Sequence, residues 1–208
     1  MPGWARGLGR LLWPGTTWTV PSKDAVFLTF DDGPFPDITP WVMDRLEQKG
    51  FEGTFFMVGA QAQRHPDLLA EVRRRGHSLG NHTMNHEKGW DVQTSMYVQS
   101  VEACDAVLTQ DGCEPRLFRP PYGKFTPRQA SVLSRQKEVI MWDVLAGDYL
   151  GAEHAQEVLA RLKRCTRPGS IVVMHDSPKA WPVLQKVLPE YLSWLAKQGW
   201  ASRVIPDR

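Results

Sequence analysis

The chain has 208 residues, a length that fits one domain with a sizeable buried core. Hydrophobic residues make up 42% and charged residues 23% of it, as in ordinary globular proteins, with no low-complexity tract and no block of like charge. The formal net charge of +2 argues against a nucleic-acid-binding surface, so we expect no nucleic-acid partner.

The first 22 residues are predicted to be a lead-in segment, followed by a single domain over residues 23–206. The lead-in is basic and aromatic, but Arg6 and Arg10 interrupt its apolar residues, which does not fit a signal peptide. No stretch approaches the roughly 20 apolar residues of a membrane span, so we expect no stable membrane insertion and a cytoplasmic protein. Two roles stay open for the lead-in: packing on the domain, or peripheral membrane association through its Trp and Leu side chains.

Short apolar runs alternate with longer helical patterns along the domain, which is typical of β/α units around a parallel sheet. Residues 25–30 predict a buried strand, and Thr39 is a predicted N-cap with Pro40 at the first helical position. The other predicted strands are 54–58, 78–80, 117–119, 139–142, 171–174 and 201–205; the other predicted helices are 66–75, 94–110, 153–164, one opened by Thr126 and Pro127, and one from Trp181 to Gly199. Seven strands with intervening helices predict a closed or partly closed α/β barrel.

Polar side chains suited to catalysis follow the predicted strands. They are Asp31 and Asp32 after the first strand, Asn81, His82 and His86 after the third, Arg119 and Tyr122 at the fourth, Asp143 and Asp148 after the fifth, and His175 and Asp176 after the sixth. Because the carboxyl ends of the strands form one face of a β/α barrel, we expect these side chains to meet at one site.

Two histidines and one carboxylate form a candidate metal site. His82 and His86 are four residues apart, so both rings can face the same way. With Asp32 they make a three-ligand set that leaves positions open for water and substrate. Asp31 and Asp32 would repel each other, and a cation bound by Asp32 relieves this and leaves Asp31 free as a base. Such a set also suits iron in oxygen chemistry, but Asp31 and a late histidine, His175, have no obvious role there.

Five motifs occur in order along the domain: TFDDGP (29–34), HTMNH (82–86), RPPYG (119–123), WDVLAGDY (142–149) and VMHD (173–176). In order and spacing they resemble the motifs of the polysaccharide deacetylase family, also called the NodB-homology group or carbohydrate esterase family 4. The resemblance covers roughly residues 23–206 and implies a distorted (β/α)7 barrel. It also implies a hydrolase that removes N- or O-acetyl groups with a divalent metal, zinc first, with cobalt or nickel as alternatives.

Carried over motif by motif, the resemblance implies a role for each matched residue. Asp31 would be the general base, and Arg119 would orient it and pair with its charge. The metal would be held by the three ligands named above. The backbone N–H of Tyr122 would stabilise the oxyanion, and His175, held by Asp148, would be the general acid.

Three further residues bear on the substrate. Tyr149 and Val173 stand where the family often has Trp and Leu, and both are expected to line the pocket for the acyl methyl group. The preferred acyl group is therefore left open. Trp90, beside the histidine loop, is the predicted stacking residue for a sugar ring.

The expected substrate is an acetylated amino sugar or glycan. The same mechanism on a lipid-linked sugar, with loss of a formyl group, or on a cyclic amide is kept as an alternative, as is a non-catalytic barrel that only binds glycans. The sequence gives no prediction of the oligomeric state.

Overall fold

The computed structural model of the protein describes residues 15–109 and 115–207. The strands are β1 (Thr16–Thr17), β2 (Ala25–Asp31), β3 (Thr54–Met57), β4 (Ser78–Asn81), β5 (Leu117–Phe118), β6 (Glu138–Ile140), β7 (Val144–Leu145), β8 (Ile171–His175) and β9 (Ala201–Ser202). The helices are α2 (Thr39–Glu47), α3 (Gly59–Arg64), α4 (Pro66–Arg74), α5 (Thr94–Leu108), α6 (Pro127–Leu133), α7 (Ala155–Cys165) and α8 (Trp181–Lys197).

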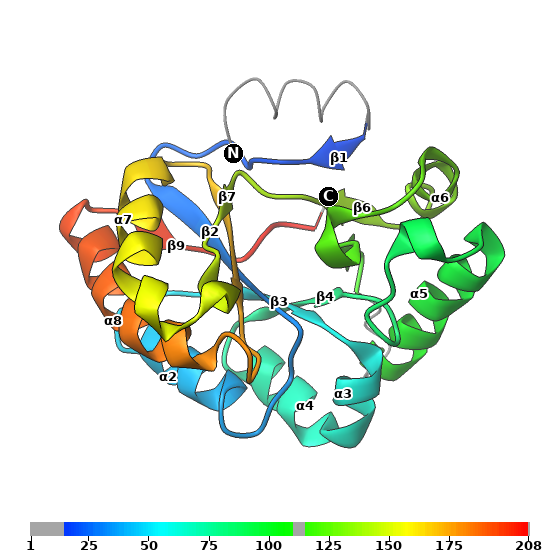
Figure 1. The fold of residues 1–208 in the computed structure, drawn as a ribbon, viewed down its shortest axis with the longest axis horizontal. Helices are drawn as coiled ribbons and strands as arrows, with labels where there is room; N and C mark the ends of the chain where they lie inside the picture. The colour runs from blue at the N-terminus through cyan, green and yellow to red at the C-terminus, as the bar shows by residue number, and fades with distance from the viewer. Residues whose placement is uncertain (1–14, 110–114, 208) are drawn as a thin grey trace.

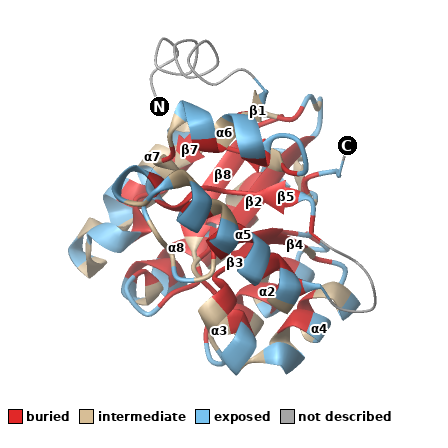
Figure 2. Cartoon of the chain, turned by 90° about the vertical axis from the view of Figure 1, so that its right-hand side faces the viewer, coloured by how far each residue is buried: buried red, intermediate tan, exposed pale blue. Residues whose placement is uncertain are grey.

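The strands form one parallel sheet in the order β1-β6-β5-β4-β3-β2-β8-β7, with β9 added beside the start of β2. The sheet is curled into a half-barrel, and the helices follow one another around its outside (Figure 1). This agrees with the partly closed α/β barrel that the strand pattern predicts and with the distorted (β/α)7 barrel that the family resemblance implies. A parallel sheet needs both faces covered, and the strands are accordingly buried while the outer faces of the helices are exposed (Figure 2).

The centre of the sheet is β2, all seven residues of which are buried. It pairs with β3 on one side and with β8 on the other. Its apolar side chains on both faces explain this position, because only a central strand of a covered sheet can bury both. The predicted strand at 25–30 is therefore confirmed, with Asp31 as one further residue at its carboxyl end.

The end of the predicted lead-in segment takes part in the fold. Thr16 and Thr17 of β1 pair with β6, Thr19 bridges to Ser170, and the Trp18 side chain is buried. The tryptophan and leucine side chains proposed for membrane contact lie within residues 1–14, outside the described residues. In the described part of the chain, no helix has the length and apolar character of a membrane span. The domain boundary after residue 22 and the cytoplasmic location stay predictions.

The predicted cap of α2 is wrong by one residue. The N-cap is Ile38, and Thr39 is already helical. The Thr39 hydroxyl accepts a hydrogen bond from the Phe35 backbone N–H and donates one to the Asp176 carboxylate, so a tertiary contact uses the group expected to cap the helix. The cap of α6 is confirmed, since Thr126 and Gln129 form a reciprocal capping box.

Two predicted strands differ from the structure by more than one residue at an end, and one α-helix is additional. Residues 139–142 contribute only Val139 and Ile140 to β6, and a separate short strand, β7, follows. The last strand covers Ala201–Ser202 rather than residues 201–205. The helix α3 was not predicted, although its last residue, Arg64, lies near the site described next.

Candidate metal centre and active site

The carboxyl ends of β2, β3, β4, β5 and β8 lie at the same edge of the sheet. Asp31 pairs in register with His175 of β8 and with Phe56 of β3, and Met57 pairs with Asn81 of β4. The motif residues that follow these strands are therefore brought together by the backbone pairing. The motif residues at the ends of these strands converge at one end of the barrel as expected, whereas Asp143 does not join them, because its carboxylate bonds to Ser170 and Arg167.

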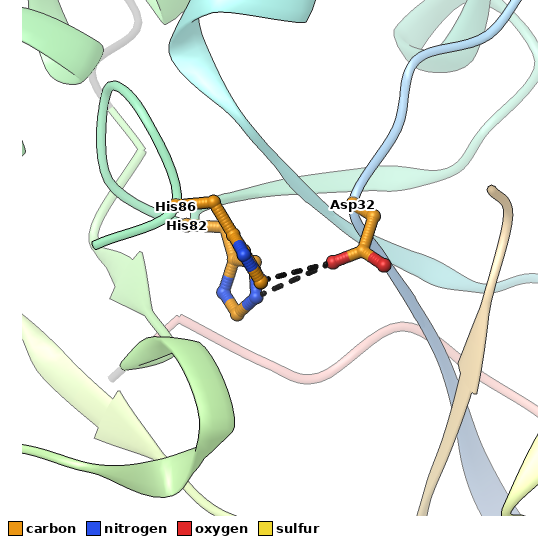
Figure 3. A group of neighbouring side chains, drawn as sticks. All are labelled: Asp32, His82 and His86. Atoms are coloured by element: carbon orange, nitrogen blue, oxygen red, sulfur yellow. Dashed lines mark ion pairs between the residues drawn. The ribbon is translucent and has the colours of Figure 1, made fainter. Parts of the chain in front are cut away.

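Asp32, His82 and His86 point toward one another from two loops (Figure 3). One ligand atom from each lies within 4.8 Å of the others. Asp32 Oδ1 is 3.2 Å from His86 Nε2 and 3.9 Å from His82 Nε2. That oxygen is buried and accepts no hydrogen bond from the described residues. A buried, unpartnered carboxylate oxygen facing two imidazole nitrogens fits a divalent cation.

The surroundings fix the chemical state of these ligands. His82 Nδ1 lies 2.7 Å from the Arg119 carbonyl oxygen, which leaves Nε2 directed toward the site. Burial lowers the pKa of His82 to about 4, so its ring is neutral, as a metal ligand must be. Burial raises the pKa of Asp32, but the nearby His86, His175 and His82 lower it by more, and the net pKa lies below the usual range.

The backbone at the site is held in an uncommon conformation. Asp32, Thr83, His86 and Tyr122 have φ values of 85°, 65°, 60° and 59°, in the left-handed region that side chains other than glycine rarely adopt. Among the described residues, no other non-glycine residue has a positive φ. Such strain is characteristic of functional sites, because it persists only where the surrounding structure enforces it.

Asp31 is held by a fully buried arginine. Arg119 Nη1 donates to Asp31 Oδ1 at 2.6 Å and to Thr29 Oγ1 at 2.7 Å. The Arg119 guanidinium also lies over the Phe56 ring, 4.1 Å from its centroid. This arginine therefore orients the Asp31 carboxylate beside the candidate metal ligand Asp32 and compensates the charge of Asp31.

A second carboxylate holds His175. Asp148 Oδ1 lies 2.8 Å from His175 Nδ1, and its Oδ2 accepts the His175 backbone N–H at 2.7 Å. Burial lowers the pKa of His175, but the Asp148 charge and hydrogen bond, with the charges of Asp31 and Asp32, raise it to about 9. His175 is therefore charged at neutral pH, the form that can donate a proton.

These groups line one cavity of about 310 Å³, which we call the acyl cavity. The titratable residues that line it include Asp31, Asp32, His82, His86 and His175. It is also lined by Pro120, Tyr122, Trp142, Leu145, Tyr149, Val173, Ser177 and Lys179. A group of titratable side chains beside aromatic and aliphatic ones suits a small molecule with one reactive polar group.

The structure places most predicted site residues in or beside the acyl cavity. Tyr122, Tyr149 and Val173 line it. Arg119 and Asp148 do not line it, but they contact the lining residues Asp31 and His175, respectively. Trp90 is different: it does not line this cavity, its ring is 58% exposed, and its Nε1 donates to the Phe125 carbonyl oxygen. The predicted stacking role of Trp90 stays a prediction.

Asp176 supports the loop that carries Asp32. Its carboxylate accepts the Gly33 backbone N–H and the Thr39 hydroxyl hydrogen. A Cβ at Gly33 would overlap this carboxylate, so the contact requires glycine there. Burial raises the pKa of Asp176 to about 8. The sequence pattern put Asp176 with the side chains expected at the site but gave it no role, because its partners lie far away along the chain.

Several lining residues were missed by sequence reasoning. Trp142 and Leu145 belong to the recognised fourth motif, and Ser177 follows the fifth directly, so adjacency to a motif was the available signal. Lys179 is four residues beyond His175 and carried no signal, because only the fold places it at the cavity. Asp143 lies elsewhere, bonded to Ser170 and Arg167.

Comparisons with known proteins agree with this geometry. The family model described as polysaccharide deacetylase matches residues 19–138, more than half of the chain. A peptidoglycan-N-acetylglucosamine deacetylase of Bacillus cereus is 33% identical over 192 residues, which cover 88% of this chain and 88% of the relative. A second deacetylase of that name from the same organism is 30% identical over 176 residues, 81% of this chain but only 64% of the relative.

A solved structure of a peptidoglycan N-acetylglucosamine deacetylase, in complex with 4-naphthalen-1-yl-N-oxidanyl-benzamide, has the same fold. Its TM-score is 0.84, its sequence identity is 26%, and the match covers 92% of this chain and 91% of that chain. The barrel, the five motifs and the sequence matches agree with one another. The chain therefore belongs to the polysaccharide deacetylase family.

Proposed function

We propose that the protein is a metal-dependent deacetylase that hydrolyses the N-acetyl group of an amino-sugar residue in a glycan. The observation that carries the proposal is the acyl cavity, where a three-ligand metal set lies between an arginine-held carboxylate and a carboxylate-held imidazolium. The relatives named above act on N-acetylglucosamine in peptidoglycan, which makes that sugar the first candidate substrate.

Asp32, His82 and His86 would hold the metal, and we propose zinc because two imidazoles and one carboxylate are ligands that zinc favours. Cobalt and nickel are the alternatives. The ion would polarise the acetyl carbonyl group and lower the pKa of a water molecule. His82 is prepared for this role, since its hydrogen bond to the Arg119 carbonyl oxygen fixes which ring nitrogen faces the site.

Asp31 is the proposed general base. Its Oδ1 is occupied by Arg119, so the side chain keeps one orientation beside the metal set. Arg119 also compensates the charge of this carboxylate in a buried position. Asp31 would take a proton from the attacking water as the bond to the carbonyl carbon forms.

His175 is the proposed general acid. An amide nitrogen is a poor leaving group until it is protonated, and the raised pKa of His175 keeps a proton available at neutral pH. The backbone N–H of Tyr122, at the mouth of the cavity, is the proposed donor to the oxyanion. Val173, Leu145 and Tyr149 form the walls against which the acyl methyl group would pack.

Acetate release tests the proposal. Zinc-loaded protein should release acetate from N-acetylated chito-oligosaccharides and peptidoglycan fragments, and Asp31→Asn should not. Asp37→Asn, an exposed aspartate in the loop before α2, is the matched control and should act like wild type. Formate release from N-formylated sugars and opening of cyclic amides, followed in parallel, test the alternative substrates.

A barrel that only binds glycans would need no proton donor. The pair formed by Asp148 and His175 argues against it, because a buried carboxylate that keeps an imidazole charged is chemistry for proton transfer. Binding of a glycan by wild type without release of any acyl group would contradict the proposed function.

A further inference from the structure

A second cavity, of about 520 Å³, adjoins the metal centre; we call it the side cavity. It shares Asp32, His86, Ser177 and Lys179 with the acyl cavity, so the two cavities adjoin at two of the candidate metal ligands. Its volume is in the range of pockets that take one small molecule or one sugar unit.

The side cavity is lined by two side chains that carry a positive charge. Arg64, the last residue of α3, and Lys179, in the loop before α8, both line it and are both exposed. Within the described part of the chain neither forms an ion pair. The carboxylate among the lining residues is Asp32, which the metal would neutralise. Two uncompensated cations in a concave site favour a negatively charged ligand.

The remaining lining residues suit a sugar. Gln61, Asn85 and Ser177 offer amide and hydroxyl groups for hydrogen bonds to hydroxyls, and Phe35 and Pro178 offer apolar surface to a ring. The cavity therefore combines polar and apolar groups that suit a neutral sugar ring with two positive charges that a neutral sugar does not require.

Two lysine ammonium groups also lie near tyrosine rings that line the acyl cavity. The Lys179 ammonium lies 5.6 Å from the Tyr149 ring centroid, and the Lys88 ammonium lies 5.3 Å from that of Tyr122. Both tyrosines line the acyl cavity, and their rings contact His175 and His86 respectively. Each lysine is thus positioned over an aromatic ring at the edge of the site rather than extended into solvent.

We infer that the side cavity is a subsite for the sugar adjoining the acylated one, and that Arg64 and Lys179 bind a carboxylate carried by that sugar. The inference rests on the proposed function and narrows its substrate to glycans with alternating neutral and acidic sugars. Arg64 supplies a planar pair of donors that matches the geometry of a carboxylate, and Lys179 supplies a point charge.

A matched pair of substrates tests the inference. One is a disaccharide in which N-acetylglucosamine is linked to a sugar bearing a lactyl carboxylate; the other carries the methyl amide of that carboxylate. Zinc-loaded wild type should have a kcat/KM roughly tenfold higher for the acid than for the amide, mostly through KM. Added salt should reduce this preference, because the paired charges are exposed.

Arg64→Gln and Lys179→Gln should each lower the ratio of kcat/KM for the acid to kcat/KM for the amide toward one. Arg74→Gln on α4 and Lys197→Gln at the end of α8 are the matched controls, since both are exposed, lack an ion pair in the described structure and lie outside both cavities. They should keep the preference of wild type.

The failures of the two proposals are distinct. Equal rates on acid and amide, in wild type and in both variants, would overturn the carboxylate subsite and leave the deacetylase function intact. A loss of activity on both substrates alike in Arg64→Gln and Lys179→Gln would also overturn it, since the cations would then serve the fold or the reaction. No acetate from either substrate would contradict the proposed function itself.

Discussion

Asp148 holds His175 at two points, accepting its backbone N–H with one carboxylate oxygen and contacting its ring Nδ1 with the other. The backbone contact fixes the carboxylate, and the ring contact then fixes the imidazole. One side chain thus sets both the orientation and the charge of the proposed proton donor.

Asp148→Asn should shift the alkaline limb of the kcat–pH profile downward. In wild type His175 keeps its proton until the pH passes its pKa of about 9, whereas without the carboxylate its pKa falls toward or below the ordinary 6.5. The measurement is kcat across neutral and alkaline pH, with Asp37→Asn as control. An unchanged alkaline limb would show that another group donates the proton.

The same contact predicts a pH dependence of stability. Because folding raises the pKa of His175 from 6.5 to about 9, its contribution to the free energy of unfolding is fully present below pH 6.5 and is lost as the pH rises through 9. Urea unfolding of wild type at several pH values should show this loss. Asp148→Asn should reduce or abolish it.

Arg119→Leu should destabilise the fold by about 3–5 kcal/mol, because it leaves the buried Asp31 carboxylate without its partner. The double variant Asp31→Asn with Arg119→Leu should be less destabilised than the single one, since no uncompensated charge remains. Urea denaturation measures both. Arg74→Leu, on the exposed side of α4, should change the free energy of unfolding by no more than about 0.5 kcal/mol. An effect as large as that of Arg119→Leu would contradict the explanation from burial.

Removal of the metal should abolish deacetylation and lower the melting temperature. Bound zinc at about 1,000 times its Kd stabilises a fold by about 4 kcal/mol. His82→Ala and His86→Ala should each weaken zinc binding by more than about 100-fold, measured by competition with a chelator. His154→Ala, at an exposed histidine near the start of α7, should bind zinc as wild type does. Wild-type affinity in both site variants would place the metal elsewhere.

Val173→Leu should increase the preference for the acetyl group over longer acyl groups. Val173 is buried in β8 and lines the acyl cavity, so a longer side chain takes space from the substrate. The ratio of kcat/KM for N-propionyl over N-acetyl substrates should fall several-fold. Val132→Leu on the exposed face of α6 is the control. An unaltered ratio would mean that the acyl group does not contact this wall.

The sequence was sufficient to predict the central strand, the long helix α8 and the convergence of five motifs, because each depends on local pattern or on the rule that parallel strands share a carboxyl end. It was insufficient where a tertiary partner decided the outcome. Thr39 resembled a cap, but its hydroxyl is taken by Asp176. The helix α3 has six residues, none of them a large apolar one, and no side-chain cap, so it lacked a helical signature.

The side cavity could not be predicted from sequence for the same reason. Arg64 and Lys179 are far apart along the chain and belong to no motif, and only the curl of the sheet brings α3 and the loop before α8 to the same opening. The roles of the matched motif residues, by contrast, came entirely from the family resemblance. The contacts of these residues in the structure now allow each role to be tested by substitution.

The register of β2 against β8 places Asp31 directly opposite His175. The two groups that would exchange protons with the substrate are therefore neighbours across hydrogen-bonded strands, and their separation is as rigid as the sheet. Tyr122, Tyr149 and Lys179, in contrast, stand on loops at the opening. Substitution of the Tyr149 and Lys179 side chains is therefore expected to change the glycan preference while the interval between Asp31 and His175 stays constant.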